Sequence, residues 1–267
     1  MTDVVPELLE KTKNDINKAI NKSSKALDLL KRLEEGKADY THANEYALEI
    51  AKILSKAIGQ NVNVEVLPDG RMYYNIAERF VGTLLDENTI RVGEYCKQVQ
   101  TTINNGAGYG LQGKAPQIDK NKRDGIINKL ALANNYEDVA WMVNEPVINY
   151  ITSAVNNAIN ENAQFLENAG VQGFIERTYV SGCCDWCKDV QGRYKYPDVP
   201  KNIYKRHLYC RCNVLYTLGR KKTDVWSKKQ SDDRESLIAY QNKRNSEQDY
   251  IRLQKARARS NAKALKK

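Results

Sequence analysis

The chain has 267 residues, of which 42 are Lys or Arg and 33 are Asp or Glu, so its formal net charge is +9. Regularly spaced aliphatic residues exclude a wholly disordered chain, and the length suits one large domain or two smaller ones. No apolar run approaches the roughly 20 residues of a membrane helix, and the start Met1-Thr2-Asp3 carries no apolar segment, which predicts a cytosolic protein without a signal peptide.

Two amphipathic helices are predicted near the start of the chain. Residues 6–34 form the first, because their apolar positions fall on one helical stripe: Leu9, Ile16, Ile20, Leu27 and Leu30. Residues 44–58 form the second, with a similar apolar face: Ala47, Ile50, Ala51, Leu54 and Ile58. Gly36 and Gly59 are expected to end these two helices.

A small β-hairpin is predicted near residues 62–74. Residues 62–66 alternate strictly between apolar and polar types, and the turn-forming Pro68-Asp69-Gly70 follows. Helices are then expected over residues 75–104, 119–133 and 136–168, with a glycine-rich loop over 105–118. In the last helix one core face is predicted from Ile148, Ile151, Val155 and Ile159.

The residue composition of the sequence changes after Gly170. Residues 172–181 are rich in β-formers, residues 213–217 predict another strand, and residues 182–212 contain five of the six cysteines. The predicted fold class is therefore α+β. A mainly helical domain (1–170) would precede a small zinc-stabilised, β-containing module (171–219) and a basic arm, helical or partly disordered (220–267).

The excess positive charge lies at one end of the chain. Residues 220–267 contain 15 basic and six acidic residues, a net charge of +9, so residues 1–219 are neutral in sum. Such a segment suits an anionic partner, most commonly nucleic acid. The candidate phosphate contacts lie near its end: Lys255, Arg257, Arg259, Lys263, Lys266 and Lys267.

The cysteine cluster predicts a metal site. Cys184 and Cys187 form a C-x-x-C pair, and after nineteen intervening residues His207 and Cys210 form an H-x-x-C pair. Each spacing lets two side chains face one point, and zinc takes four such ligands in a tetrahedron. Cys184, Cys187, His207 and Cys210 are the predicted ligands, with Cys212 as the substitute. Cys183 would be a spare thiol or an alternative ligand, and Cys96 a small core residue.

The cysteines also allow explanations other than a metal site. The cysteines could be buried without a metal, whereas disulfides are not expected in a reducing compartment. A four-ligand site is closed and hence structural. Zinc would also occupy His207, one of only two histidines, which leaves no base for a nuclease or a cysteine nucleophile. No enzyme is therefore predicted, and alanine at Cys187 should release the metal and unfold 172–219.

At the cysteine cluster the chain resembles the phage minor head (head morphogenesis) proteins of the MuF-like family. The resemblance lies in residues 177–182, in the flanks 214–221 and 226–229, and in these positions between them: Cys184, Cys187, Gly192, His207, Cys210, Arg211 and Cys212. The flanks resemble the variant found in prophages of low-GC Gram-positive bacteria. One departure is Leu208, where the family often has proline.

The resemblance implies a structural minor capsid protein of a bacteriophage or prophage. Such proteins are virion components that associate with the portal, and possible further partners are the major capsid or scaffolding protein. They assist head assembly or DNA packaging and ejection. Some relatives carry a fused toxin domain, but only about 40 residues follow Trp226 here, which favours the plain form. Non-specific double-stranded DNA is the expected ligand of the basic arm, and no membrane is expected. The alternative is a cytosolic zinc-finger regulator that binds nucleic acid.

Overall fold

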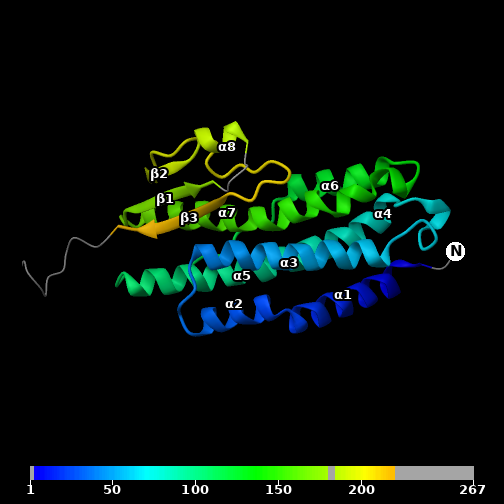
Figure 1. The fold of residues 1–267 in the computed structure, drawn as a ribbon, viewed down its shortest axis with the longest axis horizontal. Helices are drawn as coiled ribbons and strands as arrows, with labels where there is room; N and C mark the ends of the chain where they lie inside the picture. Colours follow the sequence, from blue (N-terminus) through cyan, green and yellow to red (C-terminus); the bar gives the residue numbers. More distant parts are fainter. Residues whose placement is uncertain (1–2, 180–183, 220–267) are drawn as a thin grey trace, which may run out of the picture. The chain divides into compact units, whose positions relative to one another are not determined.

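The fold is that of a computed structural model, which describes residues 3–179 and 184–219 (Figure 1). The chain divides into two units, Met1–Gly219 and Arg220–Lys267. The second unit and its candidate DNA contacts (Lys255, Arg257, Arg259, Lys263, Lys266 and Lys267) lie outside the described residues. The described unit is α+β and mainly helical, as predicted.

The single helix predicted over residues 6–34 is wrong: two helices, α1 (Val5–Lys22) and α2 (Ser24–Glu34), meet at Ser23. Ser23 has ψ of 106°, outside the helical region, and its Oγ accepts a hydrogen bond from the Ala26 N–H at 3.1 Å. This cap starts α2 as a separate helix, whose apolar face does not continue the apolar face of α1. Leu27 is consequently 47% exposed, and α2 buries Ala26, Leu29 and Leu33 instead.

Replacing Ser23 by Ala is expected to lower the free energy of unfolding by about 1 kcal/mol. The change removes the cap and also the hydrogen bond that Ser23 Oγ donates to Glu49 Oε1 of the next helix at 2.7 Å. Ser24→Ala is the matched control, because Ser24 is exposed. Urea denaturation of the two variants compares them; equal midpoints would contradict the assigned cap.

Three long helices form the centre of the unit: α3 (Tyr40–Asn61), α5 (Thr83–Gly106) and α7 (Glu145–Asn168). They pack on one another, and α1 and α2 pack on α3 (Figure 1). The apolar faces predicted for α3 and α7 are buried, which confirms them. Gly59 lies inside α3 rather than at its end, whereas Gly36, with φ of +66°, follows the end of α2 as predicted.

The hairpin predicted near residues 62–74 is also wrong. This segment contains turns and the short 3-10 helix η1 (Pro68–Gly70), and no strand. The Asn63 side-chain oxygen accepts hydrogen bonds from the Glu65 and Val66 N–H groups, both at 3.0 Å. These backbone donors are the ones a strand ladder would have used, so the local side-chain bond competes successfully with strand pairing.

Shorter helices lie between the long ones. The helix predicted at 75–104 consists of α4 (Tyr74–Ala77), the π-helical turn η2 (Glu78–Gly82) and α5. Helix α6 (Lys120–Leu132) matches the prediction at 119–133. The helix predicted from residue 136 begins as the 3-10 helix η3 (Tyr136–Val143) and continues after Asn144 as α7, so 136–168 is two helices.

An antiparallel sheet of three strands follows, in the order β2–β1–β3. Its strands are β1 (Gly173–Thr178), β2 (Gly192–Lys195) and β3 (Asn213–Leu218), with Ile175 paired to Tyr194 on one side and to Tyr216 on the other. The strands predicted at 172–181 and 213–217 correspond to β1 and β3, whereas β2 is not among the predicted strands.

The sheet shares its hydrophobic core with the helices. Ile175, Val214 and Tyr216 are buried in the same cluster as the residues of α3 and α7. The Asn44 side chain of α3 also donates a hydrogen bond to the Val214 carbonyl at 3.1 Å. The boundary predicted at residue 170 is therefore a change of secondary structure inside one unit, because the sheet's apolar face is covered by the helices. Among the described residues no helix is long and apolar enough to cross a membrane.

Candidate metal centre

The Cys/His residues are brought together by two tight turns. Cys184 precedes the short helix α8 (Asp185–Asp189), and the Cys187 N–H bonds to the Cys184 carbonyl at 3.1 Å. The Cys210 N–H bonds in the same way to the His207 carbonyl, also at 3.1 Å. Each turn places the first and fourth side chains of its motif on one side. The C-x-x-C and H-x-x-C spacings therefore fold as the sequence predicts.

The donor atoms of these residues form one cluster. His207 Nε2 lies 3.1 Å from Cys184 Sγ and 3.2 Å from Cys187 Sγ, and the Cys187 and Cys210 sulfurs are 3.8 Å apart. Ligands about 2.3 Å from zinc at tetrahedral angles lie about 3.8 Å from one another. The sulfur pair meets this spacing, and the sulfur–nitrogen pairs are slightly closer.

Cys187 is common to two overlapping groups of donors. In each group all donor atoms lie within 4.8 Å of one another; the first contains Cys184, Cys187 and His207, and the second contains Cys187, Cys210 and Cys212. All five predicted ligands are thus in the cluster, which could hold a metal ion. Cys183 lies outside the described residues.

The imidazole of His207 is oriented for metal binding. Its Nδ1 lies 2.7 Å from the Leu208 carbonyl oxygen, which can only accept a hydrogen bond. Nδ1 therefore carries the proton, and in the neutral ring the lone pair is on Nε2, the nitrogen that faces the two sulfurs. This division of roles between the ring nitrogens is typical of metal-bound histidines. Leu208 contributes to this contact through its backbone carbonyl.

The surroundings of the sulfurs fit a metal held by thiolates. Cys187, Cys210 and Cys212 are buried, whereas Cys184 and His207 are exposed. Burial, together with the neighbouring Cys210, raises the pKa of Cys187 well above its usual range. Burial acts in the same direction on Cys210, but the Cys212 backbone N–H and the Arg206 charge lower the pKa of Cys210 below the usual value. A bound cation is what would remove the proton from Cys187.

Sequence reasoning missed Arg177, which lies beside the cluster. Its side chain, on β1, is 1% exposed, and its Nη2 lies 3.8 Å from Cys187 Sγ and 3.9 Å from Cys210 Sγ. The signal that could have found it is the alternation of the strand: Ile175 and Arg177 occupy inward positions, and an inward arginine needs an anion. Arg206 is a second cation near Cys210 and Cys212, and its Nε and Nη1 atoms are buried without a hydrogen-bond partner.

Cys96 is separate from this centre. It lies on α5 and is fully buried, which confirms the prediction of a small core residue. Burial raises the pKa of its thiol to about 12, so the thiol is neutral and unreactive at pH 7.

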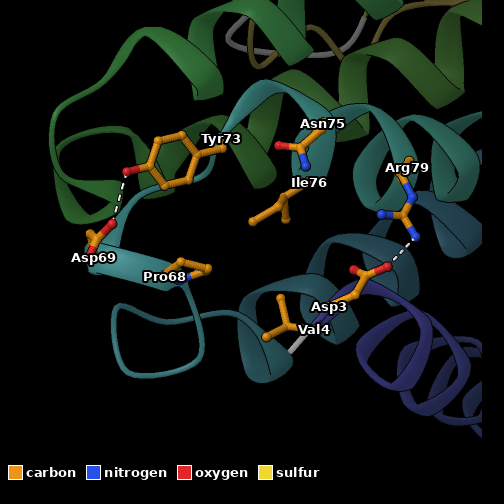
Figure 2. A pocket seen from close by; sticks show the side chains of 8 residues that line it. All are labelled: Asp3, Val4, Pro68, Asp69, Tyr73, Asn75, Ile76 and Arg79. Atoms are coloured by element: carbon orange, nitrogen blue, oxygen red, sulfur yellow. Dashed lines mark hydrogen bonds and ion pairs between the residues drawn. The ribbon is translucent and has the colours of Figure 1, made fainter. Parts of the chain in front are cut away.

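A second feature, a hollow of about 410 Å³ beside α4, offers no comparable chemistry (Figure 2). At one end Arg79 pairs with Asp3 at 2.7 Å, and at the other the Tyr73 hydroxyl donates to Asp69 at 3.0 Å. The residues that line it include neither histidine nor cysteine, and both of its carboxylates are hydrogen-bonded. The Cys/His cluster is therefore the stronger candidate for function.

In comparisons of the chain with family models, with curated proteins and with solved structures, no match was found. The class defined by the fold and the site is that of a mainly helical α+β protein whose Cys/His cluster could hold a metal ion. The function of the chain is inferred from this cluster, the fold and the distribution of charge.

Proposed function

We propose that the cluster binds one structural Zn²⁺ ion through Cys184, Cys187, His207 and Cys210, with Cys212 as the substitute ligand. The observation that carries this proposal is that Cys/His donors from two turns lie close together, in two groups that share Cys187. Four protein ligands leave no open position for substrate or water, so the role is structural and no enzyme activity follows from the site. The free energy of metal binding would stabilise the segment 184–212 against local unfolding.

The function proposed for the whole chain is that of a minor capsid, or head morphogenesis, protein of a bacteriophage or prophage. It is supported by the resemblance of the cysteine motif to the MuF-like family and by a closed site without a catalytic base. The helices would contact the portal and, with it, major capsid or scaffolding protein. The protein would act in the virion after assembly in the host cytoplasm.

The basic arm is proposed to bind double-stranded DNA without sequence preference. Its support is the net charge of +9 within residues 220–267, beside a body whose charges balance. Lys255, Arg257, Arg259, Lys263, Lys266 and Lys267 would contact phosphates. Affinity for duplexes should then fall steeply with salt and depend little on sequence, whereas strong preference for one sequence would favour the zinc-finger regulator.

Mass spectrometry of purified phage or capsid-sized particles from the source strain tests the head-protein proposal. The expected result is this chain at low copy number, together with co-purification of the portal protein. Its absence from particles that contain portal and major capsid protein would overturn the proposal.

Removal of zinc by a chelator or by mild acid is expected to loosen only part of the molecule. Thiolates and imidazole bind protons in competition with the metal, so zinc affinity falls as the pH falls from 7 towards about 5. Hydrogen exchange should then rise in 184–212, while helical circular dichroism stays nearly constant because helical residues form most of the hydrophobic core. Unchanged exchange in 184–212 after complete removal of zinc would contradict a structural role.

A further inference from the structure

Arg177 is a buried cation without a carboxylate partner in the described part of the chain. Its Nη1 donates hydrogen bonds to the carbonyls of Lys205, at 2.9 Å, and of Ile203. Carbonyl oxygens solvate the guanidinium but do not neutralise it, and an unpaired buried charge costs several kcal/mol. The remaining candidate counter-charges are the sulfurs beside it.

Arg177 contacts residues from both turns of the metal centre. Its guanidinium contacts the sulfurs of Cys187 from α8 and Cys210 from the H-x-x-C turn through Nη2. It also lies over the Trp186 ring, with 5.1 Å between the guanidinium carbon and the ring centroid. The carbonyls of Ile203 and Lys205 belong to the segment that leads into His207. One side chain on a rigid strand therefore contacts both halves of the ligand set.

We propose that Arg177 is a positioning residue of the metal centre, whose N–H groups hydrogen-bond to the metal-bound sulfurs of Cys187 and Cys210 and whose charge offsets that of the thiolates. This inference rests on the proposed zinc site. Three thiolates and one neutral histidine would give a Zn²⁺ centre a net charge of −1, and Arg177 and Arg206 are the cations that lie beside it. Hydrogen bonds from outer residues to metal ligands typically contribute about 10–100-fold to metal affinity.

The test compares the full-length protein with three variants, using Zn²⁺ and Co²⁺ as probes. Arg177→Met keeps an unbranched apolar side chain but removes the charge and the donors, and Arg177→Lys restores the charge. Arg193→Met is the matched control, because the Arg193 guanidinium lies on the next strand, exposed, above the Phe174 ring. Zinc affinity is measured by competition with a chromophoric chelator.

Arg177→Met is expected to bind zinc about 10–100-fold more weakly than wild type, with Arg177→Lys intermediate and Arg193→Met unchanged. The sulfur-to-cobalt charge-transfer bands should move to lower energy in Arg177→Met, because a thiolate that loses a hydrogen bond donates more readily to the metal. A merely structural arginine would leave the energies of these bands unchanged.

Wild-type affinity and unshifted cobalt bands in folded Arg177→Met would overturn the inference while leaving the zinc site intact. If Arg177→Met fails to fold, Arg177→Lys tests the inference instead. Its sulfur-to-cobalt bands must still lie at lower energy than those of wild type, and unshifted bands would overturn the inference. Failure of the wild-type protein to bind either metal would overturn the zinc site itself, and the two failures are thereby distinguished.

Discussion

Full-length protein with Cys187→Ala is expected to lose tight zinc binding. Cys187 belongs to both groups of donors in the cluster, and its sulfur lies 3.2 Å from His207 Nε2 and 3.8 Å from Cys210 Sγ. Structural zinc sites bind with about 10–16 kcal/mol in small zinc-finger peptides, so removal of a central thiolate should change occupancy from full to none at micromolar chelator. Metal analysis after dialysis measures the change.

Cys96→Ala is the control for Cys187→Ala. Cys96 is also buried, but it lies on α5 outside the cluster, so this variant should keep its zinc and lose about 1 kcal/mol of stability from the small cavity. Among the other thiols, Cys210→Ala should release zinc and Cys212→Ala should retain it. Retention by Cys187→Ala would mean that the ligand set is wrong.

The extent of unfolding in Cys187→Ala should be smaller than the sequence predicted. Residues 172–219 were expected to unfold together, but β1 and β3 bury Ile175, Val214 and Tyr216 in the core shared with the helices. That apolar packing remains when the metal leaves. Hydrogen exchange should therefore increase in 184–212 and remain slow in β1 and β3.

Arg123→Met is expected to lower the free energy of unfolding by about 3 kcal/mol. The Arg123 side chain, 13% exposed, ties α6 to the π-helical turn and to α5. It contacts Glu78 at 2.6 Å, Asp86 at 2.9 Å and Asp124 at 2.8 Å. Without it, three neighbouring carboxylates repel one another around an apolar methionine. Gly82 is part of the same arrangement, since a Cβ there would lie 2.7 Å from Arg123 Nη2.

The loss of unfolding free energy caused by Arg123→Met should be smaller at lower pH. Burial already raises the pKa of Asp86 above its usual value although Arg123 acts to lower it, so removal of Arg123 raises it further. An acid whose folded pKa exceeds its unfolded pKa binds more protons in the folded state, so stability rises as the pH falls towards that pKa. Arg79→Met, which breaks the exposed pair with Asp3, is the control and should cost clearly less stability than Arg123→Met. Equal costs for both variants would contradict the buried role of Arg123.

The sequence was sufficient for the long helices because their apolar faces are periodic and buried, as at Ile151, Val155 and Ile159. Prediction from the sequence failed where a single polar side chain determines the backbone conformation. Ser23 interrupts an otherwise continuous helical stripe, and Asn63 turns an alternating segment away from strand pairing. At both residues a local hydrogen bond competes with a longer apolar pattern, and the spacing of residues does not show which of the two prevails.

The metal cluster could be predicted from motif spacing alone, because the first and fourth residues of a tight turn face one point. The choice among its five donors could not, since Cys210 and Cys212 both lie near Cys187. The role of Arg177 also needed the structure. Its partners come from residues 187, 203, 205 and 210, which are distant in sequence and are joined only by the fold.

The proposed function requires one metal ion bound at the Cys/His cluster. Its sharpest test is elemental analysis of the purified full-length protein after dialysis against metal-free buffer. We expect about one zinc per chain, with Cys184, Cys187 and Cys210 protected from alkylation until the zinc is removed. A zinc content near zero, with all six thiols free to react in the unfolded chain and those of the cluster reacting at once in the folded protein, would contradict it.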